Sequence, residues 1–549
     1  MSPIKTAIAL AVASAAAGSA YALDASSMLA SNTVVLNIGG STAVDGTLLA
    51  TETALETLGP GGLCKAGTID VYQIGNPSNR LTYCTGSTDL PAGLSGVPIA
   101  IFKESNVGSF NGPGPLVGVA TTVTGNGFQL LFLNAGTPGT SGSSQLTAAN
   151  CPTVTSSDLG ANFNTFTLHQ CNASATNIQV AANPTAGIAD VEANILHDPN
   201  NSPFPTGLLS KLNGSPGLDV VWGVAVTKNL YYALQTAEHL TDGSVISTCN
   251  TANNDAPGCA PSLTRSQVAS ILTNQGSLVT WNQFNGLSNS TDNNIYICRR
   301  DPGSGTEASW EEYFLDARCG GATNPAGSQL IPWPEDGQFV FEQGSTGGIR
   351  NCLQAFYQGG TITPFTGLPA VNEPGGQWAI GVMTSEVKSG DLTASGSNLC
   401  NDCFRMIALD GVLPTLDNVV NGYDQFFSTD QFYTTSSGPD AAGTGANATL
   451  FSTMQGRMGH PVFTAITNAA FAGRPWGSGG DLAPASVFAA SNPPTIPATG
   501  TTVASNPTNA YSKAFTGSTH NCGPAVLQSA SGTIALPQTL LGSGNVNHP

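Results

Sequence analysis

The stretch "CRRDPGSGTEASWEEYF", residues 298–314, decides the expected fold because it joins a strand to a helix through a turn of small residues. The residues that lead into it, "NIYICRR" (294–300), have the alternating pattern of a β-strand. Behind the turn, apolar side chains recur at the spacing of one helix face: Trp310, Tyr313, Phe314 and Ala317. A strand, a turn and a helix in this order are the unit of α/β proteins.

The same alternation of strands and helices extends along the chain. Buried strands are predicted at 32–40, 97–105, 218–227 and 377–383, and helices at 228–240 and 261–274. Thr264 and Gln267 have the spacing of a capping box at the start of the second helix. No internal repeat is visible. We therefore predict an α/β fold with mostly parallel sheets.

The bulk composition restricts the partners. The formal net charge is −18 and only 9% of residues are charged, so nucleic acid and anionic membrane surfaces are poor partners. The 40% hydrophobic content supports a real core. No run reaches the roughly 18 apolar residues of a membrane-spanning helix, so no membrane insertion is expected.

The N-terminus reads as a targeting segment. Lys5 provides a positive start, "TAIALAVASAAAGSA" a short apolar run, and Ala20-Tyr21-Ala22 an A-x-A cleavage site. We expect residues 1–22 to be a signal peptide cleaved after Ala22, which makes the mature protein periplasmic or extracellular.

An exported chain with twelve cysteines is expected to form disulfides. The expected local pairs are Cys64–Cys84, Cys151–Cys171, Cys249–Cys259 and Cys298–Cys319. The pairing of Cys352, Cys400, Cys403 and Cys522 is left open. Cys400 and Cys403 form a C-x-x-C, for which a structural disulfide is favoured over a redox or metal role because the six histidines provide no second ligand pair at suitable spacing.

The turn at 300–306 has the chemistry of an anion site. Its glycines allow a ligand to approach the backbone, Ser304 and Thr306 carry hydroxyl donors, and Arg300 offers a planar fork for two oxygens. The free N–H groups of the following helix point at the turn. The spacings of a Walker A loop, a dinucleotide fingerprint, a G-x-S-x-G elbow and an H-E-x-x-H site are absent. The alternative interpretation is an ordinary turn.

Two further turns have a similar design. "NIGGSTAVDGTLL" (37–49) passes from a strand through Ser41 and Thr42 into a probable helix. "KESNVGSFNG" (103–112) carries Ser105 and Ser109. Turns far apart in sequence can face one ligand from two lobes, although each one alone is more often only a turn.

These blocks resemble the phosphate-binding proteins of phosphate ABC transporters, which are class II periplasmic binding proteins. "ICRRDPGSGTEASW" resembles their Arg-x-x-Gly-Ser-Gly-Thr signature, and "NIGGSTAV" resembles their first phosphate loop. Four weaker blocks follow in the family's order: "AGIADVEANIL" (186–196), "VVWGVAVTKNL", "PSLTRSQVASILTN" and "GGQWAIGVMTSE" (375–386). The likeness spans about 34–390, with large insertions between the blocks.

The resemblance implies a ligand set. Ser41 and Thr42, with Ser109 or Ser105 as the middle serine, would bind from the first lobe, and Asp190 would be the acceptor carboxylate. The second lobe would contribute Arg300, Ser304, Gly305 and Thr306. Two departures concern the neighbours of this set: Pro302 stands where the family has an Asp, with Asp301 next to it, and Ala189 replaces a usual Ser.

The resemblance also implies two α/β lobes joined by two crossovers, with a ligand cleft between them. Lobe one is expected at 24–222 plus 383–472 and lobe two at 223–382, followed by a Pro/Gly/Ser/Thr-rich C-terminal segment at 473–549. The implied function is capture of inorganic phosphate for an ABC transporter permease, without cofactor, metal or catalysis. The alternatives are a surface or matrix protein on the same fold that binds another oxyanion or none, and a secreted phosphatase.

Overall fold

The computed structural model describes residues 30–484 and short segments between 508 and 527. Within these ranges it leaves out 59, 75–78, 106–107, 120–128, 141–143, 155–161, 200, 241–248, 250–253, 275–279, 285–286, 316–317, 319–338, 366–368, 388–402, 436–444, 471–474, 510, 516–517, 520 and 523–524. The predicted signal peptide lies outside the described residues, as does Ala317.

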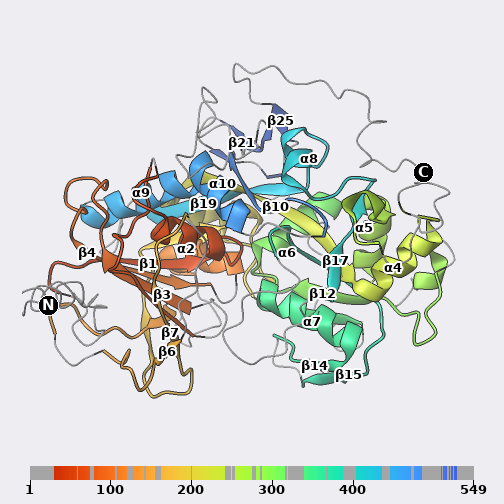
Figure 1. Cartoon of the computed structure of the whole chain (residues 1–549), viewed down its shortest axis with the longest axis horizontal. Coiled ribbons are helices and arrows are strands. Elements are labelled where there is room, and N and C mark those ends of the chain that lie inside the picture. The colour runs from red at the N-terminus through yellow and green to blue at the C-terminus, as the bar shows by residue number, and fades with distance from the viewer. Residues whose placement is uncertain are drawn as a thin grey trace, which may run out of the picture.

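One large mixed sheet runs through both halves of the molecule, in the order β13-β12-β16-β10-β19-β9-β1-β4-β3-β2-β7-β6. The second half of the sheet consists of β12 (Tyr296–Arg300), β13 (Val340–Gln343) and β16 (Ala379–Thr384). The first half consists of β1 (Val34–Gly40), β2 (Asp70–Ile74), β3 (Asn79–Thr85), β4 (Pro98–Glu104), β6 (Thr153–Val154), β7 (Thr167–Cys171), β9 (Ala186–Ala189) and β19 (Phe427–Thr435). In Figure 1 the red and orange strands of the first half lie on the left and the green elements of the second half on the right.

The strand β10 (Leu212–Thr227) connects the two halves. Its residues up to Val221 pair with β19, and those from Trp222 to Val226 pair with β16. The last residues of β10 also pair with β17 (Phe404–Met406). The chain then returns to the first half of the sheet at β19. The predicted domain boundaries remain a prediction.

Helices flank each half. The helices α2 (Asp45–Thr53), α9 (Ala446–Met458) and α10 (Pro461–Ala470) contact one another beside the first half. The helices α4 (Lys228–Ala237), α5 (Arg265–Asn274), α6 (Gly305–Leu315) and α7 (Thr346–Gln358) belong to the second half, and α8 (Leu416–Val420) precedes β19. The predicted capping box of α5 is confirmed, because the Gln267 N–H donates to Thr264 Oγ1 and the Thr264 N–H donates to Gln267 Oε1.

The α/β class is confirmed, but the expectation of mostly parallel sheets is wrong. Parallel pairing holds where strand–helix units follow one another, as in β12, β13 and β16. The strands β2, β3 and β4 form antiparallel hairpins instead, and β10 runs antiparallel to β16, β17, β19 and β20 (Asp481–Pro484).

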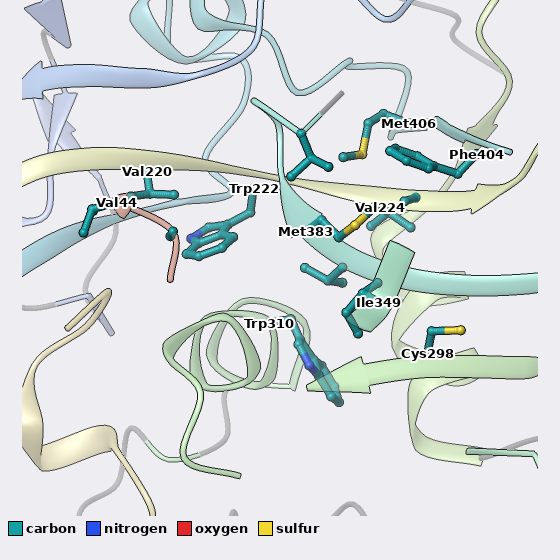
Figure 2. Close-up of a cluster of buried hydrophobic side chains, with 14 of the residues drawn as sticks. Val44, Val220, Trp222, Val224, Cys298, Trp310, Ile349, Met383, Phe404 and Met406 are labelled. Atoms are coloured by element: carbon teal, nitrogen blue, oxygen red, sulfur yellow. The ribbon is translucent and has the colours of Figure 1, made fainter. Parts of the chain in front are cut away.

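A continuous apolar core follows β10 through the molecule. Figure 2 shows Val220, Trp222 and Val224 of this strand among side chains of both halves, including Val44, Trp310, Met383 and Phe404. All of these side chains are buried. Burial of apolar surface on both sides of the crossing strand stabilises the connection between the two halves.

Three of the four predicted disulfides are confirmed: Cys64–Cys84, Cys151–Cys171 and Cys249–Cys259. The fourth prediction is wrong, because Cys298 pairs with Cys352 rather than with Cys319. Cys298 lies on β12 and Cys352 on α7, and these two elements pack together. The two cysteines are 54 residues apart in the sequence, so local spacing does not predict this pair. Cys403 and Cys522 are also disulfide-bonded. Such bonds are typical of exported proteins.

The C-terminal segment contributes structure to the body of the molecule. The strand β20 pairs with β10, and β21 (Thr508–Asn509) pairs with β20. Asn521 is buried and bonds to the Glu192 carboxylate and to the backbone of Thr429. Among the described residues, no helix combines the length and apolar character needed to cross a membrane.

Candidate functional site

The first turn of the site joins β1 to α2. Gly40, the last residue of β1, has a φ of +93°, a conformation that favours glycine. Parallel pairing of β1 with β9 brings the turn beside Asp190, which directly follows β9. The Ser41 hydroxyl donates to the Asp190 carboxylate, and the Ser41 N–H donates to the Ile188 carbonyl at 2.9 Å.

Ser109 is the second hydroxyl group beside Asp190. It lies in a 3-10 turn, Gly108–Asn111, and its Oγ accepts a bond of 3.1 Å from the Asp190 N–H. Ser105 is placed differently: its hydroxyl donates to Asp45 and accepts from the buried ammonium of Lys103. Of the two candidates for the middle serine, Ser109 therefore lies beside Asp190.

Arg300 is the last residue of β12, and three contacts within the second half of the sheet orient its guanidinium. Nε donates to the Gln343 carbonyl at 3.2 Å and Nη2 to the Gly344 carbonyl at 3.0 Å. Nη2 also lies 3.6 Å from the Asp301 carboxylate. The remaining terminal nitrogen, Nη1, donates to Thr42 Oγ1 at 3.3 Å, across 258 residues of sequence. The two turns therefore meet directly.

Gly305, the first residue of α6, brings the second turn against the first half of the sheet. A Cβ on Gly305 would lie 2.5 Å from Ser109 Oγ and 2.6 Å from Asp190 Oδ2. The Phe110 N–H donates to the Gly303 carbonyl at 2.8 Å, which adds a backbone contact between the same segments. Only glycine permits this approach.

The other two predicted residues of the second turn are buried at the helix start. Ser304 Oγ accepts from the Glu307 N–H at 3.4 Å, as a residue that caps α6 does. Thr306 Oγ1 is buried, and within the described part of the chain it has no hydrogen-bond partner. All eight predicted residues thus lie at or next to one junction, and their role in binding remains a prediction.

Lys103 is a site residue that the sequence analysis missed. Its ammonium donates to the carbonyls of Gly40 and Ser41, and lies 3.2 Å from the Asp45 carboxylate. Burial lowers the pKa of Lys103, while the charge of Asp45 opposes that shift. A lysine at the end of the apolar strand 97–105 was the available signal, since a charge inside such a strand needs a buried partner.

The carboxyls of the site are shifted by burial. Desolvation raises the pKa of Asp190, and the opposing influences are hydrogen bonds from Ser41 and Ser109 and the charges of Arg300 and Lys103. Burial raises the pKa of Asp301 to about 6, with Arg300 acting in the opposite direction. In its charged form, which Arg300 and Lys103 favour, Asp190 can only accept hydrogen bonds.

Glu307 lies beneath the second turn. Its Oε2 accepts from the Arg300 N–H at 3.2 Å and from the Trp310 indole at 2.6 Å. Burial, followed by the charge of Glu311, raises the pKa of Glu307 to about 8. Glu307 therefore supports the backbone of Arg300 without adding a full negative charge at neutral pH.

The hydroxyls of Ser41 and Ser109 and the start of α6 lie against the buried Asp190 carboxyl, and the Arg300 guanidinium meets the same turn at Thr42. A carboxyl acceptor beside several donors suits a small oxyanion that still carries a proton. Among the described residues, no group of three or more His, Cys, Asp or Glu side chains is arranged to hold a metal ion.

No protein-family model matches the sequence, and no curated protein matches it. Structural likenesses exist to a putative phosphate ABC transporter substrate-binding protein with bound phosphate from Clostridium perfringens (13% identity, TM-score 0.29, 52% of this chain and 77% of that one). Others are an ABC-type phosphate transport receptor from Vibrio cholerae (14%, 0.25, 50% and 73%) and PstS from Borrelia burgdorferi (12%, 0.23, 52% and 78%). TM-scores this low assign no ligand to this chain.

Proposed function

We propose that this protein binds inorganic phosphate, as monohydrogen phosphate, between the two halves of its sheet. The observation that carries the proposal is the junction of two distant turns, at which Arg300 donates to Thr42 and Gly305 lies against Ser109 and Asp190. Donors from both turns would surround the oxyanion, and movement of the halves about the crossing strands would admit and release it.

Asp190 would give the site its selectivity. A carboxylate can only accept a hydrogen bond, so it tolerates a ligand that carries a proton. Monohydrogen phosphate has such a proton, whereas sulfate at neutral pH has none and would face a buried negative charge. The donors Ser41, Thr42, Ser109, Arg300, Ser304, Gly305 and Thr306 would bind the remaining oxygens.

The biological setting is part of the proposal. The disulfides and the N-terminal sequence support a role outside the cytoplasm, in the periplasm or the extracellular space. There the protein would capture phosphate without chemistry and deliver it to an ABC transporter permease. The resemblance of the Arg300 turn to the phosphate-binding signature supports this partner.

The test is calorimetric titration of the mature protein, freed of bound phosphate, with phosphate and then with sulfate. We expect phosphate to bind and sulfate to give no heat. Arg300→Ala removes a charge-assisted donor and should weaken phosphate binding by at least about tenfold. Asp190→Asn, which can donate, should let sulfate bind.

Lys211→Ala is the charge-matched control, because Lys211 is exposed and lies outside the junction. It should bind phosphate as the wild-type protein does. A folded wild-type protein that binds neither ion contradicts the proposal and favours a surface or matrix protein. Release of phosphate from an ester that stops in Arg300→Ala would favour a phosphatase instead.

A further inference from the structure

Buried aspartates lie on or next to four adjacent strands of the sheet, and Asp190 of the site is one of them. Gln431 of β19 is paired with Ala189 of β9, so continuing this antiparallel register by one residue brings Asp430 opposite Asp190. On the other side of β19, Thr429 pairs with Asp219 of β10, which in turn pairs with β20, the strand that begins with Asp481. These four aspartates are almost fully buried.

Hydroxyl donors distinguish the four aspartates. Asp190 accepts from Ser41, Asp481 from Thr47, and Asp219 from Thr429 at 2.5 Å. In the described part of the chain, neither carboxyl oxygen of Asp430 has a hydrogen-bond partner, although the residue has no exposed surface. A carboxylate without donors is the costliest to keep charged in a buried position.

We propose that Asp430 is the proton-bearing partner of Asp190, a neutral carboxylic acid at neutral pH that leaves Asp190 as the charged acceptor facing the ligand. Asp430 then acts on binding only through its charge and does not touch phosphate. This inference rests on the proposed function for its consequence, but the protonation of Asp430 is a separate property of the protein.

The surrounding charges support this assignment. The groups that act most strongly on Asp430 after its burial are all carboxyls, namely Asp190, Asp481, Asp219 and Glu386, and they raise its pKa well above the usual range. Asp190, in contrast, is under the influence of Arg300 and Lys103. When two neighbouring carboxyls share a site, the proton goes to the one with fewer stabilising partners.

The consequence for binding is a change with pH. While Asp430 is neutral, a single negative charge faces the oxyanion. Once Asp430 ionises at alkaline pH, a second negative charge lies behind Asp190 and repels a dianion. Phosphate affinity should therefore fall at alkaline pH, by about tenfold or more for a unit charge in a partly dry site.

The experiment compares Asp430→Asn with the wild-type protein and with Asp219→Asn. Infrared difference spectra at pH 7 should show that Asp430→Asn loses the C=O band of one protonated carboxyl. Asp219→Asn, which removes a carboxyl that has a hydroxyl donor in Thr429, should keep that band. Phosphate titration should give Asp430→Asn the wild-type affinity at pH 7, within about threefold, without the alkaline decline.

An Asp430→Asn spectrum that loses a carboxylate band overturns the inference, whether or not phosphate binds. If phosphate does not bind to the wild-type protein, the proposed function fails while the infrared result still decides the state of Asp430. Should the variant not fold, wild-type protein labelled with ¹³C at its aspartate carboxyls is titrated by NMR. The absence of any aspartate carboxyl that stays protonated above neutral pH would then overturn the inference.

Discussion

Gly305 is the residue at which the second turn lies closest to Ser109 and Asp190. A methyl group there would come within 2.6 Å of Asp190, so Gly305→Ala must hold the halves of the sheet apart at the site. Overpacking of this kind costs about 1–3 kcal/mol, and we expect phosphate affinity to fall by about tenfold or more. Calorimetric titration of the variant measures this loss.

Gly456→Ala is the matched control for this prediction. Gly456 lies in α9, and a Cβ built on it has no neighbour within 4 Å. Alanine there should stabilise the helix by about 1 kcal/mol and leave phosphate affinity unchanged. Gly305 also lies in a helix, so a loss of affinity in Gly305→Ala that Gly456→Ala does not share would identify the contact with Ser109 and Asp190 as the cause. Wild-type affinity in Gly305→Ala would contradict it.

At the scale of the element, α7 is connected to the site strand β12 by the Cys298–Cys352 disulfide. The turn before α7 supplies the Gly344 carbonyl that receives Nη2 of Arg300, and Ser345 caps the helix by accepting from the Gly348 N–H. The position of α7 therefore affects the orientation of the guanidinium.

Replacing both Cys298 and Cys352 by Ala should lower the free energy of unfolding by about 4 kcal/mol, because the bond closes a long loop. The same change at Cys249 and Cys259, which are only 10 residues apart, should cost about 3 kcal/mol. Urea denaturation of both variants measures the difference. A larger loss for the short loop would show that loop entropy is not the main contribution.

At the scale of the whole molecule, several buried acids make stability depend on pH. Burial raises the pKa of Asp301 to about 6, of Glu238 and Asp424 to about 7, and of Glu307 to about 8. The folded protein binds more protons at these groups than the unfolded chain does. Their contribution to stability is full below the unfolded pKa values and is lost as the pH rises through the folded ones.

The expected outcome is a urea midpoint that falls between about pH 6.5 and 8.5. Burial lowers the pKa of His197 to about 3, so this group makes the protein more stable as the pH rises toward the usual histidine pKa. The pH window chosen for the prediction lies above that range. Glu307→Gln, which removes the group with a pKa of about 8, should make the decline shallower. A midpoint that rises over this window would contradict the assignment of these acids.

Local patterns in the sequence were sufficient for several individual elements. The strand–turn–helix unit at 294–314, the capping box at Thr264 and three short-range disulfides need only neighbours along the chain. The turns that carry Ser41 and Arg300 were recognisable for the same reason, because glycines, hydroxyls and a helix start lie within a few residues of one another.

The tertiary structure alone decided the long-range partners. Cys352 for Cys298, the carbonyls of Gly40 and Ser41 for Lys103, and Asp190 beside Asp430 depend on strand order and register. The mixture of parallel and antiparallel strands also depends on tertiary structure, because β10 crosses between the halves and pairs there with antiparallel strands. The sequence by itself therefore determined which turns can donate to an anion, whereas only folding brought Arg300 to Thr42, because no local interaction encodes a contact across 258 residues.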